Sequence, residues 1–346
     1  MIKRIRGWNS RKISYSGRLI LVKSVLSTIH NHWSQIFVLP VGVMDRIQAL
    51  CRTFLSEGED KYSKAPLVAW NILCKGKRNG GLGIIDSKML NVAAIGKLVW
   101  WIASKSDYLW IKWIDSIYLK GTPWMTYTPT DYSSWAWRKI CEVKETLKNG
   151  YIIGKWRGSD HSYTIADGYK WLMQEPDQKV PWYNLVWNRY NVPKCSFITW
   201  LIQHQRVLTL DRLHKMGIVD HTECYLCGVE METHAHLFQD CIFARQCFHK
   251  VAHWLGIPAT ALQDWKKLIC LKCPSMFRRQ IAMAAMVSTS YYIWHNRNIC
   301  RLEGYVMHPG KIAQMVQIEC KQRVIGIHQG PLKADDMSWC TKIGFL

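Results

Sequence analysis

The sequence predicts a mostly α-helical protein of two or three domains. Apolar side chains recur at three- and four-residue steps over several long segments, which is typical of amphipathic helices. Strand-like alternation is sparse, and 49% of the 346 residues are hydrophobic, which is enough for a packed core. Neither an internal repeat nor a low-complexity segment is evident. The chain is therefore expected to fold by packing helices against one another.

The first predicted helix covers residues 14–36. Its apolar stripe consists of Leu19, Val22, Leu26, Ile29 and Trp33. Ser14 or Ser16 is the expected N-cap, because a serine hydroxyl can accept a hydrogen bond from the first free backbone N–H groups. Pro40 cannot continue a helix, so the element is expected to end before it.

A second helix is expected over residues 43–55. Its apolar face consists of Met44, Ile47, Leu50, Cys51 and Phe54. The basic, glycine-rich segment 75–83 follows after a polar loop and one short element. It lacks the Gly-Lys-Ser/Thr ending of a phosphate-binding loop, so a turn with positive-φ glycines is expected there.

Helical periodicity returns in several later segments of the chain. These segments are residues 88–118, 135–147, 163–173, 182–216 with a break at Pro193, 244–255 and 277–301. The helical signal weakens after Gly304.

The charge balance points to a polyanionic partner. The chain carries 46 Lys and Arg against 25 Asp and Glu, a formal net charge of +21. So large a surplus repels itself in a compact fold, which favours nucleic acid as the partner, with an anionic membrane surface as the second candidate. An ordinary solvated basic surface is the alternative.

The cysteines and the N-terminus indicate an intracellular protein. Residues 1–8 are too charged for the apolar core of a secretory signal peptide. No uncharged apolar stretch reaches the roughly 18 residues that a membrane span needs. The 13 cysteines are therefore expected to be free thiols plus one metal site, in the nucleus or cytoplasm and not in a secreted protein.

One set of cysteine and histidine residues has the spacing of a metal site. Cys224, Cys227, His236 and Cys241 follow the pattern C-x2-C-x8-H-x4-C. Three thiolates and one imidazole can close a tetrahedral shell around Zn²⁺ and leave no open position for a catalytic water. The sequence therefore predicts a structural zinc site, with Asp240 or Glu232 as a hydrogen-bond acceptor for the imidazole.

Three alternatives to this site stay open. The cysteines can be buried free thiols, since unpaired cysteine is a common core residue. His234 can replace His236 as the imidazole ligand. Cys270 and Cys273 form a second C-x2-C pair, although the gap between the two pairs is long for a four-cysteine site.

Four segments in this order carry a resemblance to a known family. They are Ser14-Tyr-Ser-Gly-Arg-Leu-Ile-Leu-Val-Lys-Ser-Val-Leu26 with Trp8 before it, Ala69–Gly83 with its Gly80-Gly-Leu-Gly83, Trp187–Cys241 with Glu232-Thr233 and His236-Leu-Phe238, and Ile293-Trp-His-Asn-Arg-Asn298. With them the chain resembles the C-terminal part of plant LINE-type (non-LTR) retroelement reverse-transcriptase polyproteins.

The resemblance implies a domain organisation. Residues 1–120 are expected to be a helical thumb- or connection-like region, and residues 121–181 a linker with short elements. Residues 182–265 are expected to be the small, helical reverse-transcriptase zinc-binding domain, followed at 266–346 by a C-terminal helical segment and tail. His236 is favoured over His234, because it precedes Leu-Phe as in the family.

A thumb-like region implies contact with RNA or an RNA–DNA hybrid. The basic residues expected to neutralise phosphates are Lys3, Arg4, Arg6, Arg11, Lys12, Arg18 and Lys23. Ordinary solvation of these side chains is the alternative.

The differences between this sequence and the family's motifs determine whether we expect the chain to be catalytic. Polymerase chemistry needs palm carboxylates that hold two metal ions, and in the family they lie before the thumb in an aromatic-Ala-Asp-Asp motif. This sequence begins after that point, and its Lys333-Ala-Asp-Asp336 lies at the other end, with lysine in place of the aromatic residue. Neither the family's endonuclease nor a ribonuclease H carboxylate set is recognisable.

The expected function is therefore that of a non-catalytic, zinc-stabilised nucleic-acid-binding protein. A protein-interaction scaffold with an exposed apolar patch is the first alternative. A relic fragment without a selected function is the second.

Overall fold

The computed structural model describes residues 1–8, 13–58, 67–152, 162–175, 179–258, 264, 267 and 273–345. They form two compact units, Met1–Lys179 and Val180–Leu346. Both units are built from helices, and in the described ranges β pairing amounts to isolated bridges such as the one between Glu223 and Met231. The predicted mostly α class is confirmed.

The first unit begins with a broken series of short helices where one continuous helix was predicted. The elements are α1 (Ile2–Gly7), α2 (Tyr15–Ser24), the 3-10 turn η2 (Leu26–Thr28) and α3 (Asn31–Ser34). Ser14 caps α2, since its hydroxyl accepts a hydrogen bond from the Gly17 N–H at 3.2 Å. The break lies at Val25, whose φ of −121° and ψ of −59° are not helical. As a result Val22 and Leu26 are buried, but Trp33 is 56% exposed.

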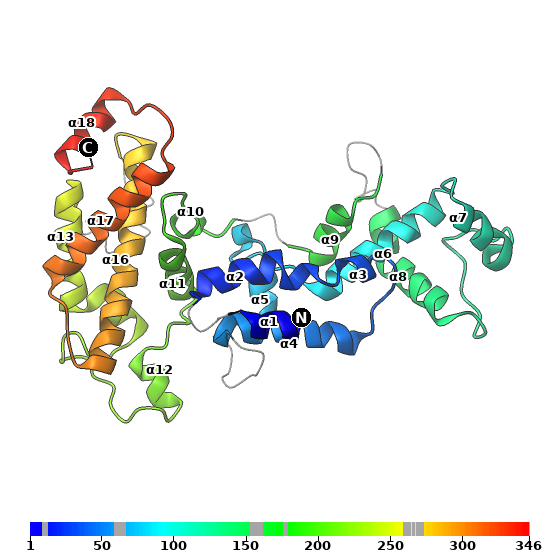
Figure 1. Ribbon diagram of the computed structural model, residues 1–346, viewed down its shortest axis with the longest axis horizontal. Helices are drawn as coiled ribbons and strands as arrows, with labels where there is room; N and C mark the ends of the chain where they lie inside the picture. The colour runs from blue at the N-terminus through cyan, green and yellow to red at the C-terminus, as the bar shows by residue number, and fades with distance from the viewer. Residues whose placement is uncertain are drawn as a thin grey trace. The chain divides into compact units, whose positions relative to one another are not determined.

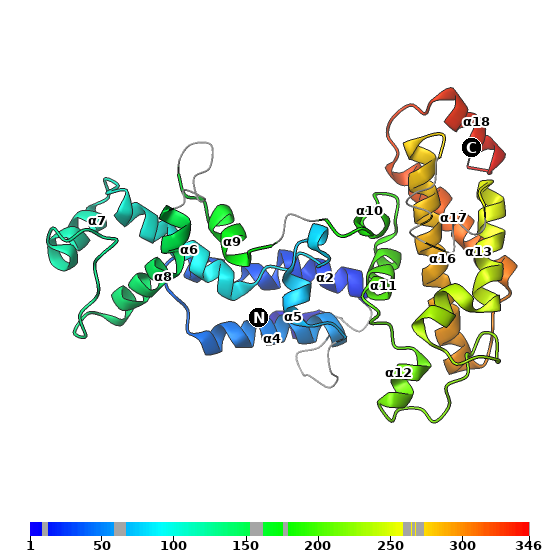
Figure 2. The ribbon, with the colours of Figure 1, turned by 180° about the vertical axis from the view of Figure 1, so that it is seen from behind.

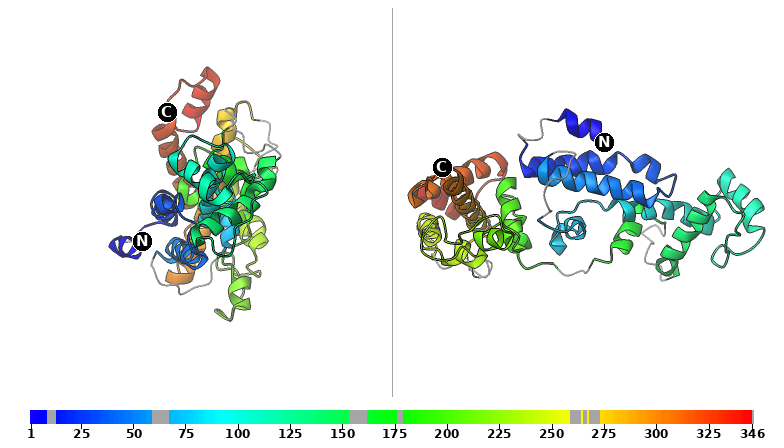
Figure 3. Two further views of the ribbon diagram at one scale, coloured as in Figure 1. Left: turned by 90° about the vertical axis from the view of Figure 1, so that its right-hand side faces the viewer. Right: turned by 90° about the horizontal axis from the view of Figure 1, so that it is seen from below.

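The second predicted helix is confirmed as α4 (Val41–Glu57), with Pro40 at its N-cap. The right panel of Figure 3 shows α2 and α4 side by side. Most of the predicted apolar face of α4 is buried, including Met44, Cys51 and Phe54. This pair of helices forms the core of the N-terminal part of the unit.

The glycine-rich segment is a tight turn, as predicted. It follows α5 (Trp70–Cys74) and contains the 3-10 turn η3 (Lys77–Asn79). Gly80 has a φ of 85°, a left-handed conformation that favours glycine. Glu175 closes the turn by accepting hydrogen bonds from the Gly76 N–H and the Asn79 side-chain amide, both at 2.6 Å.

The long helix α6 (Ser87–Ala103) organises the rest of the first unit. Figure 2 shows α8 (Trp135–Ile152) and α9 (Ile165–Met173) beside it, and the chain reaches α8 through α7 (Leu109–Ile114) and the π-helical turn η4 (Asp115–Leu119). The core between these helices includes Ile95, Val99, Trp137, Leu147 and Tyr163. Part of the segment predicted as a linker therefore contributes to a hydrophobic core.

Tyr163 explains why α6 and α9 approach each other closely. Its hydroxyl donates a hydrogen bond of 2.5 Å to the carbonyl oxygen of Ala93 on α6. A Cβ on Gly96 or on Gly168 would clash with this hydroxyl. Two glycines on facing helices thus leave the space that one buried phenol fills.

The second unit packs around one long helix, α16 (Met276–Glu303). Figure 1 shows α13 (Ile242–Leu255) and α17 (Pro309–Ile327) alongside it. The remaining elements of the unit are α10 (Tyr183–Val186), α11 (Pro193–Gln203), α12 (Leu210–Lys215), the π-helical turn η5 (His236–Asp240) and α18 (Ala334–Lys342). The helices α17 and α18 follow Gly304, where the sequence signal was weak.

Buried polar contacts hold these two late helices in place. Glu319 on α17 accepts hydrogen bonds from Ser288 and Tyr292 of α16, at 3.0 and 3.1 Å. Asp336 on α18 is buried and pairs with Arg278 at 2.8 Å. The Lys333-Ala-Asp-Asp336 sequence is thus part of the contact between α18 and α16.

Candidate metal centre

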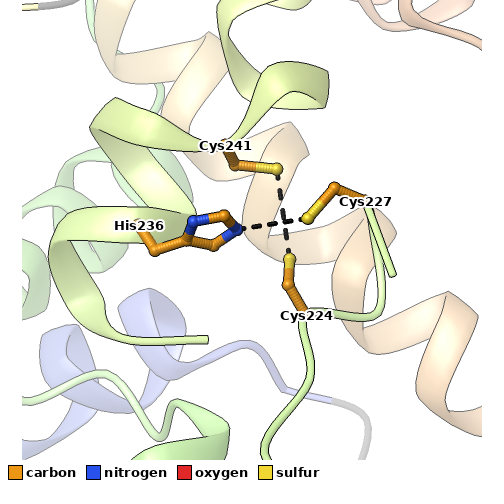
Figure 4. Close-up of side chains that lie close together, drawn as sticks. All are labelled: Cys224, Cys227, His236 and Cys241. Atoms are coloured by element: carbon orange, nitrogen blue, oxygen red, sulfur yellow. Dashed lines mark hydrogen bonds between the residues drawn. The ribbon is translucent and has the colours of Figure 1, made fainter. Parts of the chain in front are cut away.

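The structure brings Cys224, Cys227, His236 and Cys241 together, and their ligand atoms all lie within 4.8 Å of one another. Figure 4 shows the three sulfurs and the imidazole pointing at a common centre. The Cys224 and Cys241 sulfurs are 4.0 Å apart, and the Cys227 sulfur is 3.3 Å from Nε2 of His236. Zinc bonds of about 2.3 Å to sulfur and about 2.0 Å to nitrogen require edges of roughly 3.5 to 3.8 Å. The donor set therefore fits a tetrahedral Zn²⁺ site, and its atoms need to shift by no more than about 1 Å to reach these edges.

The first two ligands come from a tight backbone turn. The Gly228 N–H donates to the Cys224 carbonyl at 2.8 Å, and Gly228 has a φ of 68° that allows the chain to reverse. The backbone N–H groups of Leu226 and Cys227 point at the Cys224 sulfur. Donors of this kind stabilise a thiolate, which is the form that binds a metal.

The other two ligands flank the π-helical turn η5. The Cys241 N–H donates to the His236 carbonyl at 2.7 Å, which closes the turn and brings both side chains to the same side. Cys241 is also the N-cap of α13, and the Phe243 and Ala244 N–H groups point at its sulfur. The positive end of the α13 dipole adds to this field.

The pKa values of the two facing thiols, Cys224 and Cys241, shift in opposite directions. Their mutual hydrogen bond lowers the pKa of Cys241, which accepts it, and the backbone donors at the start of α13 lower it further. The same bond, with burial, raises the pKa of Cys224. Cys241 is thus the more readily ionised of the two thiols, and metal binding displaces the protons of cysteine ligands.

Glu230 orients the imidazole. Its carboxylate lies 2.9 Å from Nδ1 of His236, which leaves Nε2 directed at the sulfurs. This corrects the expectation that Asp240 or Glu232 accepts from the ring. Glu230 lies close enough to do so because the isolated bridge between Glu223 and Met231 folds the loop back beneath the ligands.

His234 does not join the cluster. Its ring packs against Phe238 with centroids 5.3 Å apart. The structure therefore places His236, and not its rival, at the candidate centre. Of the second C-x2-C pair, Cys270 lies outside the described residues.

Glu232 has a different role from the one predicted. Its buried carboxylate pairs with Arg297, which is 2% exposed and belongs to the Ile293–Asn298 motif on α16. The carboxylate also accepts a hydrogen bond of 3.0 Å from the Leu210 N–H at the start of α12. Two motifs that are distant in the sequence thus meet directly behind the metal loop.

The predicted phosphate-binding residues fall into three groups. Arg11 and Lys12 lie outside the described residues, and Lys3, Arg4 and Arg6 are exposed on α1. Arg18 packs its guanidinium 5.6 Å from the Tyr15 ring centroid. Lys23 is half-buried and donates to the Leu82 carbonyl at 3.0 Å, and burial, followed by the charge of Lys77, lowers its pKa.

The neighbouring turn presents three further basic side chains that were not among the predicted phosphate-binding residues. Lys75, Lys77 and Arg78 are exposed around Gly76. The signal was present as a basic segment between glycines, but only the fold shows that this turn faces solvent.

Comparisons with known proteins agree with this site. A family model described as zinc-binding in reverse transcriptase matches residues 163–248. A protein of Arabidopsis thaliana that carries the name of a ribonuclease H protein is 33% identical over 152 residues, which is 42% of this chain and 24% of that protein. An uncharacterized mitochondrial protein of the same plant is 30% identical over 135 residues, which is 37% of this chain and 80% of that protein.

The chain spans about a quarter of the length of the first of these relatives and most of the second. The matched family model contains the whole Cys and His cluster, from Cys224 to Cys241. On these grounds the chain belongs to the reverse-transcriptase-related proteins of plant retroelements, and it contains their zinc-binding domain.

Proposed function

We propose that this protein is a non-catalytic, zinc-stabilised module from a LINE-type element that binds RNA or RNA–DNA hybrids. The observation that carries the proposal is the net charge of +21 on a chain that matches a family model of zinc-binding in reverse transcriptase and is similar to a protein named as a ribonuclease H protein. A surplus of this size supplies the cations that displace counterions from phosphates. Exposed basic residues on α1 and on the glycine turn are the first candidates for these contacts.

The chemistry of the metal centre supports a structural role. Cys224, Cys227, His236 and Cys241 would hold Zn²⁺ with four protein ligands. When bound, the metal cross-links the loop and contributes its binding free energy to folding. The α12 and α16 helices that pack behind the loop are then held through Glu232 and Arg297.

The proposal also places the protein in a reducing compartment, the nucleus or the cytoplasm. The twelve cysteines that the structure describes are all free, which is the usual state of intracellular thiols. None of the described helices combines the length and the apolar character needed to cross a bilayer.

The test combines metal content with binding across a salt series. Purified protein is expected to contain about one zinc per chain and to bind a fluorescent RNA–DNA hybrid. We expect log K to fall linearly with log salt at a slope of about −0.9 per neutralised phosphate. Zinc without salt-sensitive binding would contradict the nucleic-acid function, and nucleotide incorporation or hybrid cleavage would contradict the non-catalytic part.

One observation favours a second function, that of a protein-interaction scaffold. Around α3 the first unit exposes large apolar side chains, including Trp33 at 56% and Val41 at 66%. Trp33 and Phe37 stack with ring centroids 6.4 Å apart. Binding that is insensitive to salt and is lost in Trp33→Ser would support this function over the first.

A further inference from the structure

A cavity of about 710 Å³ lies in the second unit beside the metal loop. It is formed where α11, η5, α13 and α16 meet. Its rim includes the exposed residues Pro181, Gln205 and Gln239, so it opens to solvent. The volume lies within the range of about 300 to 1,000 Å³ that small-molecule sites occupy.

Aromatic side chains form much of the wall. Trp182 is half-buried at the entrance, while Phe238 and Phe248 are 5% and 1% exposed. The two phenylalanines make the wall apolar, and the partly open Trp182 ring favours a flat, polarisable ligand that can stack on it. The metal loop supplies this wall directly, because Phe238 lies within the η5 turn between two of the candidate zinc ligands.

Two polar atoms in the cavity wall are without a hydrogen-bond partner. The Thr199 side chain is 3% exposed, and its hydroxyl is buried and unpaired. Nε2 of His234 is also buried and unpaired. A buried polar group without a partner has lost its hydration with nothing in exchange, so such groups are rare unless a ligand or water satisfies them. The site therefore offers one donor-acceptor hydroxyl and one ring nitrogen to a ligand.

From these features we propose that the cavity binds a single unstacked nucleobase of an RNA or DNA strand. A heterocyclic base has flat faces that the half-buried Trp182 ring can stack on, and edge atoms that can pair with Thr199 and His234. Arg206 is exposed next to Gln205 on the rim, where it can meet the adjoining phosphate. Single-stranded segments present bases in this way, whereas a duplex keeps them stacked.

This inference rests on the proposed nucleic-acid function and adds to it a preference for unpaired bases. It separates two contributions to binding. The basic surface neutralises phosphates without regard to base, and the cavity adds affinity only when a base is present. The two contributions can be measured independently.

The experiment uses zinc-loaded full-length protein and three labelled dodecamers: oligo(U), oligo(dU) and an abasic DNA strand with the same number of phosphates. We expect the uracil-containing strands to bind about tenfold more tightly than the abasic strand, in line with the usual gain from one stacked base. The salt slopes of oligo(dU) and the abasic strand should be equal. Comparison of oligo(U) with oligo(dU) shows which sugar the site accepts.

Substitutions in the cavity wall test whether the preference for base-containing strands arises in the cavity. Trp182→Leu and Thr199→Val should reduce the ratio between oligo(dU) and abasic binding towards one and leave abasic binding unchanged. Thr289→Val is the matched control, because Thr289 is equally buried but pairs with the Ala285 carbonyl and does not line the cavity. Photo-crosslinking of wild-type protein to 4-thiouridine in oligo(U) should label a peptide containing Trp182 or residues 233–239.

The outcomes separate the two proposals. Equal binding of oligo(dU) and the abasic strand, or crosslinks that all fall outside the cavity, would overturn the base-binding site and leave phosphate binding intact. Failure of all three strands and of the RNA–DNA hybrid to bind the zinc-loaded protein would overturn the proposed function as well.

Discussion

Arg297 on α16 donates three hydrogen bonds to the carboxylate of Glu232 in the metal loop. Its Nε lies 2.9 and 3.0 Å from the two carboxylate oxygens, and its Nη2 lies 2.5 Å from one of them. Both side chains are almost fully buried, at 2% and 0% exposed. One ion pair therefore joins the candidate zinc loop to the central helix of the second unit.

Removal of one partner of this pair should destabilise the second unit strongly. Arg297→Met leaves the Glu232 carboxylate buried without its counter-charge, which typically costs about 3 to 5 kcal/mol. Chemical denaturation in excess zinc measures the loss. The control is Lys112→Met, whose ion pair with Asp107 is 67% and 86% exposed and should contribute no more than about 1 kcal/mol.

The double variant Glu232→Leu/Arg297→Met tests whether the loss of stability comes from the unpaired charge. Because it leaves no unpaired charge, it is expected to unfold at higher denaturant than Arg297→Met alone. An Arg297→Met protein as stable as the Lys112→Met control would contradict the importance of the pair.

Loss of one metal ligand should unfold the loop and spare the first unit. Zinc binding contributes about 10 to 16 kcal/mol in small finger peptides, which exceeds the stability of many whole domains. Cys224→Ser is therefore expected to open residues 220–245 to a protease of broad specificity. Cys247→Ser is the control, since Cys247 is equally buried on α13 but lies outside the cluster. The idea fails if the Cys224→Ser protein shows no new cleavage in the loop.

The Glu230 carboxylate, which lies against Nδ1 of His236, should raise the affinity for zinc although it is not itself a ligand. Glu230→Ala removes the acceptor that lies 2.9 Å from Nδ1, so the ring loses its orientation and part of its basicity. We expect zinc to bind at least about tenfold more weakly in competition with a chelator. Glu223→Ala should leave the affinity unchanged, because Glu223 pairs through its backbone only. Equal affinities in the two variants would exclude this role.

A buried thiol in the first unit should make the protein sensitive to alkali. Burial raises the pKa of Cys51 from 9.0 to about 12. The unfolded chain therefore loses this proton at lower pH than the folded chain, so stability is complete below pH 9 and falls as pH rises towards 12. The slope is about 1.4 kcal/mol per pH unit for one thiol.

The matching measurement compares wild type with Cys51→Ala by urea unfolding at two pH values within that window. The variant should lose less stability on going from the lower to the higher pH, although its packing is weaker at both. Identical pH dependence in the two proteins would show that Cys51 does not contribute.

The sequence predicted most helices because their apolar period is regular, and it failed where tertiary packing decides. No proline or glycine stands at Val25, so the sequence gives no sign of the break there. The apolar stripe through Ile29 and Trp33 therefore predicted a continuous helix. The late helix α17 was not identified, although its buried residues Ile312, Val316 and Cys320 recur at helical spacing. Exposed Ile318 and Ile325 place apolar residues outside that stripe, and Glu319 packs inward onto α16, so the pattern is blurred.

The metal centre was more accessible to sequence reasoning than its surroundings. Ligand spacing is a local property, so the four residues that the structure clusters could be named before the fold was known. The partners of Glu232 and of the His236 ring depend on how the loop folds back and on a helix 65 residues away. Such long-range contacts cannot be inferred from spacing alone.

The metal cluster is local in sequence, whereas the Glu232–Arg297 pair is not, and this difference orders their formation while the chain is being synthesised. The outermost ligands, Cys224 and Cys241, are only 17 residues apart, so a ribosome that has released this loop has released every atom the metal needs. Arg297 emerges 65 residues after Glu232. With the proposed zinc, a nascent chain can thus close this loop early, at small cost in loop entropy. Glu232 then stays without its counter-charge until α16 is synthesised.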